Sequence, residues 1–269
     1  MRHGARMTTR TARPLRCSVG ALAKAAGTAV AELLLPSVCA GCGGLGAAAC
    51  ESCLAELASG PVPVAPGVAA LTRHDGVARE LVLAHKERGR RDLARPLGQA
   101  LARALPRLPR ASPDADGTWW FVPVPSRPSA ARARGGSHVM ALARSCAARI
   151  AEQGGAAAVA PALRLSARAR DAVGLDRAAR MANLAGRVLL DPDGAPTPGT
   201  PVVLLDDVVT TGATVEACTR VLASHGAVVT AALTLTAASR TVAWPRHRVK
   251  HRHLSPTRVI GELNEGGRR

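Results

Sequence analysis

The chain has 269 residues, which is enough for one large domain or two smaller ones, and 47% of them are hydrophobic, so a sizeable core can form. No apolar run is long enough to cross a membrane, so the sequence argues against a membrane-spanning protein and we expect a cytoplasmic one. The net charge of +17 suggests nucleic acid as a partner, but one phenylalanine and three tryptophans are too few aromatic side chains for a base-stacking platform.

The positive charge is concentrated at the two ends of the chain. Residues 1–30 carry six basic and no acidic residues, and residues 240–269 carry eight basic and two acidic residues. These two segments supply +12 of the charge and leave +5 for the 209 residues between them. We therefore expect a basic N-terminal extension over 1–32 and a basic, disordered tail over 240–269. Such ends are either solvated or make electrostatic contacts with DNA or RNA.

Two C-x-x-C pairs, separated by seven residues, lie in the N-terminal part of the chain. Their cysteines are Cys39, Cys42, Cys50 and Cys53. Two intervening residues let a turn aim both thiolates of a pair at one tetrahedral ion, and four thiolates leave no open position, so we predict a structural Zn²⁺ ribbon over 33–60. A disulfide pair and a redox-active C-x-x-C are the alternatives. The remaining cysteines lack such spacing and are expected to be tail or core thiols: Cys17, Cys146 and Cys218.

The next segments alternate between extended and helical patterns. Three prolines in residues 54–70 predict a linker or an extended edge. Apolar spacing predicts a helix over 76–86, which ends at Lys86, and a second helix over about 93–105. The run from Trp119 to Pro125 predicts a strand that ends in a proline turn.

A basic, glycine-containing loop follows this strand and precedes a predicted helix over about 137–151. A strand, a basic loop and a helix in that order build an anion site, and arginines suit a pyrophosphate; in a chain this rich in arginine, a solvated loop is the alternative. The arginines of this loop are Arg127, Arg132 and Arg134. Farther on, the polar and basic residues 163–175 predict a mobile loop, and Asp176 predicts the start of a short helix.

The most informative stretch runs from Pro201 to Thr214. Its first part is an apolar run, β-branched near its start, which is typical of a fully buried strand of a parallel sheet. Two adjacent carboxylates, Asp206 and Asp207, end this run, and a Thr/Gly loop leads into a helix that begins near Val215. Loop amides, hydroxyl groups and the positive end of the helix dipole converge there and predict an anion cradle. Its predicted binding residues are Thr210, Thr211, Gly212, Ala213 and Thr214.

Asp206 and Asp207, which we call the acid pair, make this cradle more specific than a phosphate site. Two carboxylates would repel a bare phosphate, but they suit a ligand that carries neutral hydroxyl groups beside its phosphate or brings a divalent cation. A sugar phosphate meets both conditions. The simpler alternative is a helix cap, but a cap needs one polar residue rather than two carboxylates and three threonines. Strands that alternate with helices predict an α/β fold with a parallel, doubly wound sheet and ligands at the carboxyl ends of its strands.

The order of these motifs resembles the ComF/GntX family of phosphoribosyltransferase-like proteins over roughly residues 33–238. The matching pieces are Leu35-Pro36-Ser37-Val38-Cys39 before the other cysteines, the helix ending at Lys86, Val122-Pro123-Val124-Pro125 with Arg134-Gly135, Arg180 with Asn183-Leu184-Ala185-Gly186, and the run from Asp206 to Thr214. The chain departs from the family at Gly136-Ser137-His138, where an aromatic-Asn-Gln segment is usual.

The resemblance implies a type I phosphoribosyltransferase fold over 61–239, in which the acid pair holds the ribose hydroxyls of phosphoribosyl pyrophosphate and the Thr/Gly loop holds its 5′-phosphate. Mg²⁺ would bridge the pyrophosphate. We expect Arg134 to act in catalysis with the acid pair, and Lys86 and Arg132 to bind substrate. The implied role is DNA uptake, with single-stranded DNA and the DNA-uptake helicase machinery as partners. The expected activity is phosphoribosyl transfer to an acceptor that the sequence does not identify, and the alternative is a non-catalytic module that handles single-stranded DNA or senses the ligand.

Overall fold

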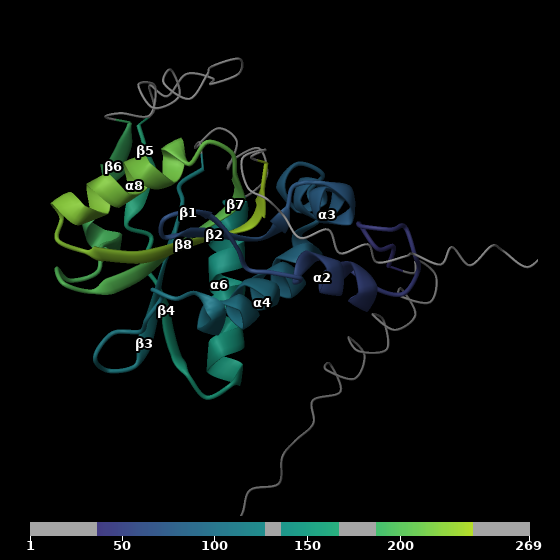
Figure 1. The fold of residues 1–269 in the computed structure, drawn as a ribbon, viewed down its shortest axis with the longest axis horizontal. Helices are drawn as coiled ribbons and strands as arrows, with labels where there is room; N and C mark the ends of the chain where they lie inside the picture. The colour runs from purple at the N-terminus through teal and green to yellow at the C-terminus, as the bar shows by residue number, and fades with distance from the viewer. Residues whose placement is uncertain (1–36, 127–135, 167–186, 239–269) are drawn as a thin grey trace, which may run out of the picture.

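The computed structural model describes residues 37–126, 136–166 and 187–238. They form a mixed α/β fold around a six-stranded sheet with the strand order β1-β2-β8-β7-β3-β4 (Figure 1). Neighbouring strands are parallel except β1 and β2, which are antiparallel, so the expected α/β class with a mostly parallel sheet is confirmed. The strands are β1 (Val62–Ala65), β2 (Val68–Arg73), β3 (Thr118–Pro123), β4 (Ala156–Val159), β7 (Pro201–Val209) and β8 (Val228–Ala237).

Helices cover both faces of this sheet (Figure 1). In β7, Val203 and Leu205 pack into one hydrophobic core, whereas Val202 and Leu204 pack into another. The continuous apolar run of this strand is therefore buried on both faces, as a central parallel strand requires. The helices that share the first core are α2 (Glu51–Leu57), α3 (Gly76–Lys86), α4 (Ala94–Ala104) and α6 (His138–Glu152), and α8 (Ala213–Ser224) packs into the second.

Three helices predicted before the acid pair lie in the described residues, and all three agree with the structure in position. α3 has the predicted bounds, and Ser137 caps α6 by accepting a hydrogen bond from the backbone amide of Met140 at 3.3 Å. The face of α6 that was expected to point inward is buried: Val139, Leu142, Ala143 and Ile150. Short 3-10 turns span Arg91–Leu93, Leu105–Arg107 and Pro192–Gly194, the first two at the ends of α4.

The proline-rich segment forms an outer edge of the sheet rather than a linker. α2 ends at Leu57, and the β1–β2 hairpin follows it closely. β1 is the first strand in the sheet order, so β2 is its sole neighbour in the described sheet. Pro63 lies inside β1, and Pro61 and Pro66 lie just beyond its ends. Prolines are tolerated there because an edge strand needs amide donors on one side only.

The mobile loop predicted over residues 163–175 is wrong for its first three residues. These form β5 (Leu163–Leu165), which pairs antiparallel with β6 (Val188–Leu190). The apolar side chain of Leu163 packs into the second core, which favours an ordered strand here. The rest of that loop, the short helix expected after Asp176 and the basic ends of the chain lie outside the described residues. Within the described ranges, every helix is too short or too polar to span a bilayer.

Candidate functional site

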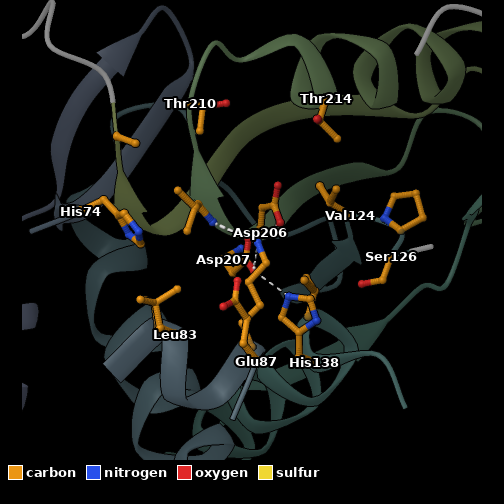
Figure 2. A pocket seen from close by; sticks show the side chains of 16 residues that line it. His74, Leu83, Glu87, Val124, Ser126, His138, Asp206, Asp207, Thr210 and Thr214 are labelled. Atoms are coloured by element: carbon orange, nitrogen blue, oxygen red, sulfur yellow. Dashed lines mark hydrogen bonds and ion pairs between the residues drawn. The ribbon is translucent and has the colours of Figure 1, made fainter. Parts of the chain in front are cut away.

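A cavity of about 400 Å³ lies at the carboxyl ends of the parallel strands, where ligands bind in open α/β sheets (Figure 2). We call it the central cavity. Its wall comes from the end of β7, the first turn of α8, the end of α3, the loop after β3 and the start of α6. It brings together five of the predicted site residues: Lys86, Asp206, Asp207, Thr210 and Thr214.

Asp207 lies deep in the central cavity and is only 4% exposed. Its Oδ2 accepts a hydrogen bond from His138 Nε2 at 2.6 Å and lies 2.9 Å from the ammonium group of Lys86. Its Oδ1 accepts a hydrogen bond from the backbone amide of Val208 at 2.6 Å. Burial alone would raise the pKa of Asp207, but the His138 hydrogen bond and the Lys86 charge outweigh burial and lower it. Asp207 is therefore a carboxylate anion at neutral pH.

Asp206 has a different environment, although it is the adjacent residue. It is partly exposed, and its Oδ1 accepts a hydrogen bond from the backbone amide of Asp207 at 2.8 Å. Among the described residues, no cationic side chain forms an ion pair with it. Although part of the residue is exposed, protein atoms surround the carboxyl group, and this desolvation, followed by the charge of Asp207, raises the pKa of Asp206 well above its usual range. The acid pair therefore combines one carboxylate that stays ionised at neutral pH with one carboxyl group that is readily protonated.

Three histidines around the acid pair were not predicted. His138 begins α6, is 9% exposed and donates from Nε2, because a carboxylate can only accept; its Nδ1 has no hydrogen-bond partner among the described residues. The ring nitrogens of buried His85 lie 3.3 Å from the backbone oxygens of Arg90 and His138, and burial lowers the pKa of His85. His74 Nδ1 lies 2.8 Å from the hydroxyl of Thr236, and burial lowers the pKa of His74.

The Thr/Gly loop connects β7 to α8 as predicted. Gly212 precedes the helix with a φ of 78°, a conformation that favours glycine. Thr211 Oγ1 accepts a hydrogen bond from the backbone amide of Ala213 at 3.4 Å, and Thr210 and Thr214 line the central cavity. The first amides of a helix have no partner within the helix, so the start of α8 can attract an anion into the cavity.

The four cysteines of the two C-x-x-C pairs form a candidate metal centre. Their sulfur atoms all lie within 4.8 Å of one another, close enough to hold one metal ion such as zinc. Cys39 Sγ accepts a hydrogen bond from the backbone amide of Cys50 at 3.3 Å. A hydrogen bond with Ser52 lowers the pKa of Cys50 to about 6, whereas burial raises the pKa of Cys53. A Cβ on Gly41 would lie 3.0 Å from the sulfur of Cys53, so a glycine is needed in this turn.

The other residues and the Mg²⁺ ion that the sequence predicted differ in how far the structure supports them. Arg132 and Arg134 lie outside the described ranges. Lys86, which was expected to bind substrate, lines the central cavity but is paired with Asp207; burial would lower its pKa, but the Asp207 charge raises it. In the described part of the chain, the four cysteines are the only cluster of three or more ligand side chains that could hold a metal ion, so Mg²⁺ has no independent support. Cys146 and Cys218 are buried core thiols, as expected.

Comparisons with known proteins assign no family to this chain. No protein-family model matches it, and no curated protein matches it. The geometry of the central cavity and of the four cysteines therefore carries the functional conclusions.

Proposed function

We propose that this protein is a ComF/GntX-type, phosphoribosyltransferase-like protein that binds phosphoribosyl pyrophosphate in the central cavity. The observation that carries the proposal is the acid pair near the end of β7, directly before a Thr/Gly loop that enters α8 on the same cavity. A sugar phosphate needs hydroxyl acceptors beside an anion site, and the central cavity offers both. Under this proposal, the mostly parallel sheet is a type I phosphoribosyltransferase fold.

In the proposed complex, the 5′-phosphate lies at the start of α8 with Thr210 and Thr214 as hydroxyl donors, and the ribose faces the acid pair. Mg²⁺ brought by the ligand would neutralise the pyrophosphate, and Arg132 and Arg134 would supply further positive charge, whereas the charge of Lys86 is paired with Asp207. In turnover, an acceptor nucleophile forms a bond to the anomeric carbon while the bond from that carbon to pyrophosphate breaks, and pyrophosphate leaves with the electron pair. The nearby carboxylates stabilise the oxocarbenium-like charge of the transition state.

The four cysteines would hold a structural Zn²⁺. Four thiolates complete a tetrahedral shell and leave no position for water or substrate, so the ion would stabilise the fold rather than take part in catalysis. Because these residues pack beside α3, which carries Lys86, the metal would support one wall of the central cavity.

The cellular role that accompanies this proposal is cytoplasmic DNA uptake during natural transformation, with single-stranded DNA and the uptake helicase machinery as partners. A non-catalytic module that handles single-stranded DNA or senses the ligand is the second candidate, and the basic residues at the chain ends favour it. The two candidates differ in one measurable property. An enzyme releases pyrophosphate when an acceptor is present, whereas a module binds the ligand or DNA without consuming either.

Titration calorimetry with phosphoribosyl pyrophosphate and Mg²⁺ tests the proposal. The wild type should bind, and the double variant Asp206→Asn/Asp207→Asn should lose at least about tenfold in affinity, because each hydrogen bond to a charged group contributes about 1.5 to 3 kcal/mol. Asp193→Asn is the matched control, since this exposed acid lies on the 3-10 turn Pro192–Gly194 and not on the central cavity. Failure of a folded, zinc-loaded wild type to bind would contradict the proposal and favour the DNA-handling module.

A further inference from the structure

The two carboxyl groups of the acid pair have very different numbers of partners. Asp207 is buried and has three: His138 Nε2 at 2.6 Å, Lys86 Nζ at 2.9 Å and the amide of Val208 at 2.6 Å. Asp206 is more exposed, and its carboxyl group accepts one hydrogen bond within the described structure, from the amide of Asp207. The two carboxyl groups therefore differ in how readily they can accept a hydrogen bond from a ligand hydroxyl.

A carboxylate offers about four acceptor positions. Three of these positions on Asp207 already have a partner: Oδ2 contacts both His138 Nε2 and the Lys86 ammonium group, and Oδ1 accepts the hydrogen bond from the Val208 amide. A sugar hydroxyl would have to displace one of these charge-assisted contacts, which are stronger than a hydrogen bond from a neutral hydroxyl. Among the described residues, Asp206 has no side-chain cation that a hydrogen bond from a sugar hydroxyl would have to displace.

This inference rests on the proposed function. We propose that Lys86 and His138 hold Asp207 as the fixed anion of the central cavity, and that Asp206 alone accepts the vicinal hydroxyl groups of a bound ribose phosphate. The two oxygens of one carboxyl group can serve the two hydroxyls of a vicinal diol. In the view of Figure 2, Thr210 and Thr214 lie above the acid pair and His138 lies below it, so His138 contacts Asp207 from the side away from the threonines. His138 is then a positioning residue that acts on the ligand through Asp207.

The arrangement determines which sugar the cavity selects. If Asp206 accepts both hydroxyls, a sugar that lacks one of them leaves an acceptor without its donor and binds more weakly. The wild type should therefore prefer ribose 5-phosphate to 2-deoxyribose 5-phosphate by at least about tenfold.

Calorimetric titration of both sugar phosphates into a set of variants tests this division. Asp206→Asn should reduce the preference for ribose to less than about threefold, because an amide has one acceptor oxygen. His138→Leu removes the hydrogen-bond donor to Asp207. It should lower the affinity for both sugar phosphates by about tenfold and leave the ratio of the two affinities unchanged. His138→Gln keeps an N–H donor and should bind both sugars within about threefold of the wild type.

The outcomes separate this inference from the proposed function. A wild type that binds neither ribose 5-phosphate nor phosphoribosyl pyrophosphate overturns both. A wild type that binds both ligands, together with an Asp206→Asn variant that keeps the ribose preference, overturns the division of the acid pair alone. Identical binding by folded His138→Leu and His138→Gln overturns the positioning role of His138. Should His138→Leu fail to fold, the ribose preference of Asp206→Asn, compared with that of the wild type, tests the division of the acid pair.

Discussion

Two neighbouring carboxyl groups near the end of β7 have opposite acid–base behaviour. Burial works against ionisation of Asp207, but His138 and Lys86 overcome it and lower the pKa. Burial and the charge of Asp207 raise the pKa of Asp206. The same residue type thus contributes a permanent charge at one position and a readily protonated group at the next. The free energy of unfolding should therefore depend on pH differently for the two residues.

Asp206→Asn and Asp207→Asn should change the free energy of unfolding in opposite directions at neutral pH. The folded pKa of Asp206 is raised, so its contribution is fully present below the unfolded pKa of about 3.9 and is lost as pH rises through the folded pKa. Asp206→Asn should therefore match or exceed wild-type stability at neutral pH. The folded pKa of Asp207 is lowered, so its contribution is present above about 3.9 and is lost as pH falls through the folded pKa. Asp207→Asn should cost about 2 kcal/mol at neutral pH.

Urea unfolding between about pH 2 and pH 8 measures both effects. The cost of Asp207→Asn should stay nearly constant down to about pH 4 and shrink below it, whereas any gain from Asp206→Asn should shrink as the pH falls toward about 3.9. Two variants with superimposable stability profiles would contradict the assigned environments.

The acid pair could be predicted because it belongs to one continuous motif, but the partners of Asp207 could not. They come from α3 and α6, which are distant in the sequence, and nothing local marks His138 as a partner. The one available signal was its position directly after the Ser137 cap, at the end of a basic loop. His85 and His74 carried no signal, since their environments depend on packing between distant elements.

At the scale of elements, the connection from β7 to α8 was predictable in detail, and the short strands were not. A buried apolar run and a glycine at a helix start have strong sequence preferences, so the strand, the loop and the helix follow from one another. β4 has four residues and β5 has three, which is too short for a periodic pattern to appear. Their pairing was therefore visible only in the folded structure.

Gly212→Ala should weaken ligand binding, whereas Gly117→Ala should not. The two glycines have φ values of 78° and 80°, and a Cβ at either position would meet no atom within 4 Å, so the cost is backbone strain of about 1 to 2 kcal/mol in both variants. Gly212 lies in the Thr/Gly loop, which holds the 5′-phosphate in the proposed complex, while Gly117 precedes the amino end of β3. Calorimetry with phosphoribosyl pyrophosphate should show a loss of at least about fivefold for Gly212→Ala alone. Equal affinities of the two variants would exclude the loop backbone from the binding site.

At the scale of the whole molecule, the cysteine segment and the sheet depend on the same core. Cys39, Cys53 and Leu57 belong to the hydrophobic cluster that also contains the buried residues of α3 and α4. Arg90 adds a polar link, because its guanidinium donates to the backbone oxygen of Val38 at 3.0 Å and its own backbone oxygen faces the His85 ring. Loss of order around the cysteines should therefore reach the central cavity.

Removing a metal ion held by the four cysteines, as proposed, should destabilise the entire fold in one transition. A chelator under reducing conditions should lower the melting temperature by at least about 5 °C, because metal binding free energy is folding free energy. Cys42→Ser should produce a similar shift, since Cys42 is exposed and its replacement removes a ligand without opening a core cavity. The chelator should then have no further effect on Cys42→Ser. A wild-type melting curve that the chelator does not change would contradict a structural metal here.

The prolines around β1 have a consequence for contacts between copies of the chain. An outer strand with free amide hydrogens is a template on which another molecule can extend the sheet and start aggregation. Pro63 has no amide hydrogen to offer, and the rigid rings of Pro61 and Pro66 stand at both ends of the strand. A second molecule that aligned a strand with β1 would gain an incomplete ladder of hydrogen bonds. The same residues that made this segment difficult to assign thus protect one border of the sheet when many copies crowd together.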